Sequence, residues 1–124
     1  MLVTCLCATW CLTCEAYRAT FAEIAERFPD MTFRWVDIED ESDVVGELDI
    51  QNFPTLLIQS GTQVRFFGTV TPQPRVLEAI VAACVRESMA QRDLDRDVED
   101  LADRFCELFP QACGHALQAA SAAR

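Results

Sequence analysis

Apolar residues recur along the first half of this chain in two alternating patterns, one typical of buried strands and one typical of helices. Residues 2–8 form a continuous apolar run, which is expected for a strand buried on both faces of a sheet. Between residues 11 and 28 apolar side chains recur every three or four positions, so we predict an amphipathic helix that ends at Pro29. Residues 31–38 are rich in aromatic and β-branched residues and predict a second strand, followed by a short helix near residues 44–48.

The middle of the chain predicts a β-hairpin followed by a helix. Two apolar strands, residues 55–59 and 63–67, flank a short turn that contains a glycine. Thr71 and Pro72 are residue types preferred at the start of a helix, so the next helix is expected to begin there and to continue to about residue 84.

The last third of the chain is highly charged, but an apolar stripe at helical spacing continues through it. The stripe consists of Leu94, Val98, Leu101, Phe105 and Leu108. It predicts a further helix, and the segment 111–120 predicts a last short one. We therefore expect a main domain at residues 1–87 and a helical C-terminal extension at residues 88–124. The stripe could be the buried side of a solvated helix, or a surface that docks a partner or a second copy of the chain.

The overall composition excludes several classes of function. The chain has 124 residues with 20 acidic and 10 basic side chains, and its formal net charge of −10 would repel nucleic acids and anionic membrane surfaces. Because the sequence contains no lysine, Schiff-base chemistry and a lysine general base are excluded. No apolar run is long enough for a membrane span or for the core of a signal peptide, so a cytoplasmic protein is expected.

The strongest chemical signal is a W-C-x-x-C motif at residues 10–14, between the first predicted strand and the first predicted helix. Two cysteines at this spacing can form and open a disulfide bond. Cys11 would lie at the start of the helix, where unpaired backbone N–H groups and the helix dipole stabilise a thiolate. Cys14 would lie one turn deeper. We therefore expect Cys11 to be the attacking nucleophile and Cys14 the resolving cysteine, the alternative being that both are ordinary buried core thiols.

The element order and several motifs together resemble the thioredoxin superfamily over residues 2–85. These motifs are the W-C-x-x-C motif, the segment Phe53-Pro54-Thr55-Leu56-Leu57, which resembles the cis-proline segment of the family, and turn glycines at Gly61 and Gly68. The resemblance implies an α/β fold whose four-stranded mixed sheet has the order 2-1-3-4, as in glutaredoxins, with helices on both faces. The leading strand and helix usual in thioredoxins are missing from this pattern.

The resemblance also implies roles for three residues near the motif. Pro54 is expected to be cis and to pack against the active-site disulfide, while the backbone of Phe53 is expected to hydrogen-bond an extended substrate. Trp10 is expected to form part of the docking surface for that substrate. The alternatives are a trans proline at the start of a strand and a tryptophan that fills a gap beside the helix.

Near the motif, the sequence departs from the thioredoxin pattern. Cys5 and Trp35 stand where thioredoxins have a buried aspartate and its lysine partner, so that proton-relay pair is absent. Leu12 and Thr13 replace the usual glycine and proline, and Glu15 replaces a lysine. A carboxylate at this position should disfavour a thiolate nearby, so the redox potential of the pair does not follow from the resemblance.

Two cysteines of the first strand raise the possibility of a metal site. Cys5 and Cys7 share one face of that strand, because strand side chains alternate. With Cys11 and Cys14 they form a C-x-C-x3-C-x2-C pattern that could bind zinc or an iron–sulfur cluster. A strand interior would place Cys5 under the helix, so we favour small core residues for Cys5 and Cys7 and predict neither a metal site nor a cofactor.

The remaining cysteines and the single histidine are expected to have no part in the chemistry. Cys84 should lie on the core face of its helix, and Cys106 and Cys113 could form a disulfide that joins two helices. His115 is expected to be solvated.

Three functions are compatible with these features. The first is a thiol–disulfide oxidoreductase of thioredoxin type, which reduces protein disulfides and is regenerated by an external reductase. The second is a non-catalytic thioredoxin-like adaptor or chaperone that binds a partner through its C-terminal helices, and the third is a metal-carrying module. The strand at residues 31–38 would be an exposed sheet edge, which either the C-terminal helices or a partner would cover, so a homodimer is also expected.

Overall fold

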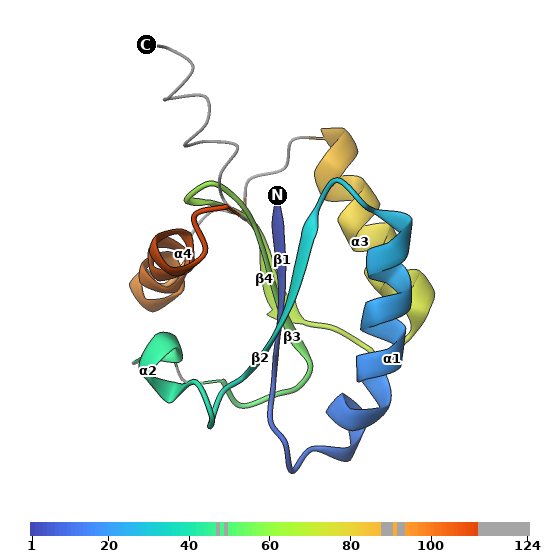
Figure 1. Ribbon diagram of the computed structural model, residues 1–124, viewed down its shortest axis with the longest axis horizontal. Coiled ribbons are helices and arrows are strands. Elements are labelled where there is room, and N and C mark those ends of the chain that lie inside the picture. The colour runs from blue at the N-terminus through green and yellow to red at the C-terminus, as the bar shows by residue number, and fades with distance from the viewer. Residues whose placement is uncertain (47, 49, 88–90, 92–93, 112–124) are drawn as a thin grey trace.

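The computed structural model describes residues 1–46, 48, 50–87, 91 and 94–111, which form a four-stranded sheet between two layers of helices (Figure 1). The strands are β1 (Leu2–Cys7), β2 (Thr32–Asp37), β3 (Thr55–Ser60) and β4 (Gln63–Thr69). The helices are α1 (Leu12–Arg27), α2 (Ser42–Val45), α3 (Pro74–Glu87) and α4 (Arg96–Leu108). The sheet order is β2-β1-β3-β4, with β1 parallel to β2 and antiparallel to β3. The expected α/β fold and strand order are confirmed.

The side chains of β1 alternate between the two helical layers. All six residues of β1 are buried, as the continuous apolar run predicted. Val3, Cys5 and Cys7 join the core between the sheet and the layer of α1 and α3, whereas Leu2 and Leu6 join the core on the opposite face. Figure 1 shows this division, with α1 and α3 on one side of the sheet and α2 and α4 on the other.

In the first layer, α1 and α3 cover the face on which the cysteines of β1 lie. The α1 side chains in this core are Cys14, Tyr17, Phe21 and Ile24, and those of α3 are Leu77, Val81 and Cys84. A surface ion pair between Arg27 Nη1 and Glu78 Oε2, 2.7 Å apart, joins the two helices. Both side chains are largely exposed, so the pair adds little to stability compared with the apolar contacts beneath it.

The start of α3 differs from the prediction. The helix begins at Pro74 rather than at Thr71 and Pro72, and the carbonyl of Gln73 accepts the first helical hydrogen bonds. The N–H of Val70 still donates to the carbonyl of Pro54, at 3.0 Å, so the chain is tied to the sheet at that point. Residues 71–73 therefore cross from the sheet to the helical layer, and Pro74 rather than Pro72 takes the first helical position.

Helix α4 is the main cover of the opposite face. The stripe residues Val98, Leu101 and Phe105 are almost fully buried and pack in one cluster with Leu2 and Leu6 of β1. The hypothesis that this stripe docks a partner is therefore wrong for these three residues, and their interpretation as the buried side of a helix is confirmed. Of the stripe, Leu108 is half exposed.

Two polar side chains fasten α4 to its neighbours. Gln59 of β3 is fully buried, and its Nε2 donates to the carbonyl oxygens of Gly61 and Ala102, both at 2.9 Å. Arg104 of α4 donates from Nε and Nη2 to the carbonyls at the end of α2, at 2.7 and 2.9 Å. The guanidinium also lies against Gly46, whose φ of 67° ends α2 in a conformation that suits glycine.

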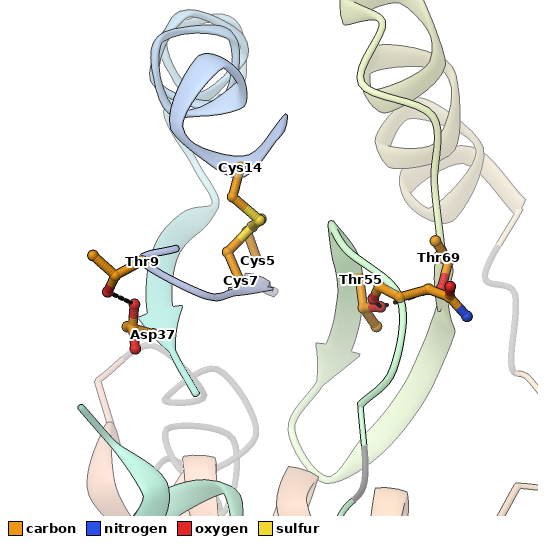
Figure 2. Close-up of a disulfide and its surroundings, with 8 residues drawn as sticks. Cys5, Cys7, Thr9, Cys14, Asp37, Thr55 and Thr69 are labelled. Atoms are coloured by element: carbon orange, nitrogen blue, oxygen red, sulfur yellow. Dashed lines mark hydrogen bonds between the residues drawn. A yellow bond between two sulfur atoms is a disulfide. The ribbon is translucent and has the colours of Figure 1, made fainter. Parts of the chain in front are cut away.

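A hydrogen bond to β2 holds the loop between β1 and α1. The hydroxyl of Thr9 donates to one carboxylate oxygen of Asp37, and the other oxygen accepts from the backbone N–H groups of Glu39 and Asp40 (Figure 2). Partial burial acts to raise the pKa of the Asp37 carboxyl, but these hydrogen bonds outweigh it and hold that pKa below its usual range. The loop that leads into the W-C-x-x-C motif is thereby anchored to the end of the neighbouring strand.

Two further expectations concern the ends and edges of the fold. Apart from Gln111, the last predicted helix lies outside the described residues, as do Cys113 and His115, so the Cys106–Cys113 bond stays a prediction. In the described sheet, β2 is an edge strand. Among the helices that the structure describes, none combines the length and the apolar character needed to cross a membrane.

Replacing Gln59 by leucine tests the fastening of α4. Gln59→Leu removes the donor that serves the carbonyls of Gly61 and Ala102, and we expect the free energy of unfolding in urea to fall by about 1–3 kcal/mol. The matched control is Gln63→Leu, at an exposed position of β4, which should change stability by less than about 0.5 kcal/mol. Equal losses in the two variants would contradict a fastening role.

Replacing Thr9 by valine tests the anchor at Asp37. A carboxyl whose folded-state pKa is depressed stabilises the fold above its unfolded value near 3.9, and this stabilisation is lost as the pH falls through the folded value. Thr9→Val should therefore lower the free energy of unfolding at neutral pH by about 1 kcal/mol or less, because the site is partly solvated, and the difference from wild type should vanish in acid. Urea unfolding as a function of pH measures this, with the exposed Thr62→Val as the control. A difference that persists unchanged in acid would show that the carboxylate is not involved.

Candidate redox site

Cys11 occupies the position immediately before the first residue of α1. Its backbone is extended, with φ −87° and ψ 115°, and its N–H donates to the carbonyl of Ala8 at 3.0 Å. The side chain makes no capping hydrogen bond to the helix, the thiol is free, and the residue is partly exposed. Cys11 thus stands at the N-terminus of α1, as expected from the sequence, where the N–H groups of the first turn have no helical partner.

Cys14 is joined by a disulfide bond to Cys7, the last residue of β1 (Figure 2). Their Cα atoms are 5.8 Å apart, and at most 1% of either residue is exposed. The C-x-x-C motif predicts a bond between Cys14 and Cys11, with Cys7 as a core residue, so the observed bond differs from that prediction. The signal was present, because the alternation of β1 directs Cys7 toward the helical layer in which Cys14 lies on the buried side of the first turn.

A third cysteine of the same face, Cys5, lies next to this disulfide. Its sulfur is 3.6 Å from that of Cys7, and the residue is fully buried. Burial raises the pKa of the Cys5 thiol well above its usual range, and the positive charge of Arg18 offsets only part of this rise. Cys5 is therefore a protonated thiol at neutral pH.

Tyr17 of α1 adds a second protonated group to this interior. Its side chain is 1% exposed, and within the described part of the chain its hydroxyl has no hydrogen-bond partner. Burial raises the pKa of the Tyr17 phenol, and the proximity of Cys5 raises it further. Sequence analysis did not single out Tyr17, because an aromatic residue at helical spacing is typical of a core.

Trp35 fills the position at which the family has a lysine. It lies opposite Cys5 in the register of β1 and β2, and its ring packs against Phe21 with centroids 5.8 Å apart. The guanidinium of Arg18 lies over the same ring, 4.6 Å from its centroid. The acid–base pair that the sequence lacks is thus replaced by an apolar and aromatic interior with a cation at its rim.

Trp10, Phe53 and Pro54, which the resemblance assigned to substrate binding, come together beside the motif. The peptide bond between Phe53 and Pro54 is cis, which confirms the expectation for that bond. The ring of Trp10 meets the ring of Phe53 edge to face, with centroids 5.6 Å apart, and the tryptophan is 64% exposed. Their part in binding a substrate stays a prediction.

The segment that carries the cis proline is tied to β4. The hydroxyl of Thr55, the first residue of β3, donates to the carbonyl of Asn52 at 2.6 Å and lies 3.3 Å from the hydroxyl of Thr69 (Figure 2). These contacts hold residues 52–55 against β4. They thereby also position the ring of Phe53, against which Trp10 packs.

Within the described residues, no three or more side chains of the metal-binding types come together as a potential site. The free cysteines there are Cys5, Cys11 and Cys84. Cys84 is buried in the core as expected, and burial raises the pKa of its thiol. Of the three free thiols, Cys11 is thus the one that a solvent-borne reagent can reach.

Comparisons with known proteins agree with this arrangement. The family model "Thioredoxin" matches residues 1–82. A thioredoxin H-type from Picea mariana is 36% identical over 58 residues, and thioredoxin-2 from Pyricularia oryzae is 34% identical over 77 residues. These alignments cover 46% and 61% of this chain but only 46% and 44% of the relatives, so the chain spans less than half of their length.

A similarity in fold extends to solved structures. The thioredoxin from Trypanosoma brucei brucei superposes with a TM-score of 0.61 at 22% identity, covering 69% of this chain and 75% of that one. The oxidised mitochondrial thioredoxin 3 from Saccharomyces cerevisiae gives a TM-score of 0.55 at 24% identity, covering 63% and 73%. The matched family model extends from β1 into α3 and spans the W-C-x-x-C motif and the cis proline described above. The chain therefore belongs to the thioredoxin family.

Proposed function

We propose that this chain is a thiol–disulfide oxidoreductase that reduces protein disulfides through Cys11 and Cys14. The observation that carries the proposal is the placement of Cys11, a free and partly exposed thiol at the N-terminus of α1, one turn before the buried Cys14, which is disulfide-bonded to Cys7. Exposed Trp10, held against Phe53, gives this thiol a flat apolar neighbour on which a polypeptide can rest.

The reaction proceeds through two exchanges of sulfur partners. The Cys11 thiolate attacks one sulfur of the substrate disulfide, forms a mixed disulfide and releases the other substrate sulfur as a thiolate. Cys14 then attacks Cys11 Sγ, which breaks the mixed disulfide and releases the second substrate thiol. The substrate has gained two electrons, and the chain holds a Cys11–Cys14 disulfide that an external dithiol reductase reduces for the next cycle.

Cys14 can take part in this cycle only when it is a thiol. The disulfide to Cys7 therefore has to be reduced first, and the same external dithiol can do this. The partners of the chain are thus a protein disulfide and a reductase, and its net charge of −10 favours partners with basic surfaces. The edge strand β2 supports the further proposal of a homodimer, because an unpaired edge can add a strand from a second copy.

A non-catalytic role is the second candidate, and the Cys7–Cys14 bond favours it. A buried disulfide between β1 and α1 can serve simply to hold the first helix on the sheet. In that case Cys11 would lack a resolving partner, and the chain would act as an adaptor. The buried side of α4 is not available to such an adaptor, so its partner would have to bind elsewhere.

Reduction of insulin disulfides in the presence of dithiothreitol separates the two roles. We expect the wild-type chain to accelerate the reaction over dithiothreitol alone, and Cys11→Ser to lose the whole acceleration because the attacking sulfur is gone. Reduced Cys14→Ser, incubated with insulin after removal of dithiothreitol, should retain a covalent insulin adduct on Cys11 that mass spectrometry detects, because no resolving thiol releases it. The control is Cys84→Ser, which removes a buried thiol of α3 and should keep the wild-type rate. Absence of acceleration by the folded wild-type chain would refute the enzymatic role.

A further inference from the structure

Three further cysteines lie in the same region as Cys14, and two of them are possible disulfide partners. Cys7 is bonded to it across the interface between β1 and α1, and Cys5 lies 3.6 Å from Cys7 on the same strand face. Cys11 lies three residues before Cys14 in the sequence, at the exposed start of the same helix. Side chains three positions apart at a helix end are neighbours, with Cβ atoms roughly 5–6 Å apart, so Cys14 has a possible partner on either side.

We propose that the disulfide formed between Cys11 and Cys14 is passed inward to Cys7, which leaves Cys11 as a lone exposed thiol. The inference rests on the proposed function, because that function produces the Cys11–Cys14 bond. In the exchange, Cys7 loses its proton and its sulfur attacks Cys14 Sγ. The Cys7–Cys14 bond forms, the Cys11–Cys14 bond breaks, and Cys11 leaves as a thiolate that can take up a proton. Cys7 is oxidised from a thiol to a disulfide sulfur and Cys11 is reduced to a thiolate, so the chain as a whole neither gains nor loses electrons.

Burial determines both the rate and the result of this exchange. Cys7 is fully buried, which disfavours its thiolate and makes its attack slow compared with reactions of Cys11. Once formed, the Cys7–Cys14 bond is enclosed between strand and helix, so external thiols reduce it only slowly. The leaving sulfur of Cys11, in contrast, belongs to a partly exposed residue at the start of α1, where it can react with reagents in solution. The inward bond is therefore the slow but lasting product.

The form with the inward disulfide has a different activity from the reduced form. Cys11 can still attack a disulfide R–S–S–R, giving Cys11–S–S–R and R–S⁻, but Cys14 is no longer free to release the adduct. The chain then retains its partner until a dithiol reduces the Cys7–Cys14 bond. Oxidation thus converts a turnover site into a site that captures one half of a small-molecule or protein disulfide as a mixed disulfide on Cys11.

Cys5 is a bystander in this scheme. Its sulfur lies 3.6 Å from that of Cys7, but Cys5 precedes Cys7 by two residues on one extended strand. As a protonated thiol it is a poor nucleophile. Its substitution therefore provides the matched control for Cys7.

Glutathione disulfide is a suitable probe, because one reagent reports both the bond and the captured thiol. The reduced wild-type chain is incubated with it in excess, stopped with acid at intervals, alkylated and digested with pepsin. Cuts near Leu6, Trp10 and Leu12 separate the four cysteines for mass spectrometry. We expect the final state to contain a Cys7–Cys14 bond and glutathione on Cys11. Cys7→Ala should end with a Cys11–Cys14 bond and no glutathione, and Cys5→Ala should behave as wild type.

The route through Cys11 has its own test. In Cys11→Ser the Cys7–Cys14 bond should form at least about tenfold more slowly, because glutathione disulfide cannot reach the two buried sulfurs directly. A wild-type chain that ends with a Cys11–Cys14 bond and no glutathione would overturn the proposal, as would equal rates in Cys11→Ser. Insulin reduction by Cys7→Ala tests the proposed function separately. Its failure, together with the expected glutathione pattern, would remove the reductase role and leave the exchange standing.

Discussion

A strand that is buried on both faces requires a layer of helices on each side, and β1 is such a strand. One face of β1 carries the cysteines and is covered by α1 and α3. The other face carries leucines, and α4 closes it. The redox site and the C-terminal helix are thus consequences of the same alternation, one on each side of a six-residue strand. Loss of α4 would expose the apolar face directly behind the cysteines.

The sequence predicted those features that depend on local periodicity or on a motif. The apolar run of β1, the spacing of α1 and the cis proline were all found where expected. The role of α4 was not determined by its stripe, because a buried helix side and a docking surface have the same pattern until the opposing sheet face is known. The start of α3 was misplaced because two prolines fit the first helical position, and a hydrogen bond from Val70 decides between them.

The W-C-x-x-C motif could not predict the pairing of the cysteines either, because this pairing also depends on how separate elements pack together. A C-x-x-C motif describes neighbours along one helix, whereas Cys7 and Cys14 meet across the junction of a strand and a helix. Only the relative position of the two elements brings them within bonding distance. The interior around them is also specific to this chain, because Cys5, Tyr17 and Trp35 provide thiol, phenol and indole groups in place of a carboxylate and an ammonium. Protons that leave or enter Cys14 therefore have no buried ionised relay of the family type at these positions.

The sulfur of Cys11 stands at a helix position that normally favours an oxygen. Serine, threonine, aspartate and asparagine cap a helix by accepting a backbone hydrogen bond there, and Cys11 makes no such bond. The chain thus forgoes the stability that an oxygen cap gives, roughly 1 kcal/mol for a typical helix, at the residue for which we propose a nucleophilic role. Selection would therefore act in opposite directions on the side-chain atom at position 11. Greater stability would favour an oxygen, whereas a reactive thiol requires a sulfur. A serine at position 11 would provide the oxygen cap and so stabilise α1, but it would remove the reactive sulfur.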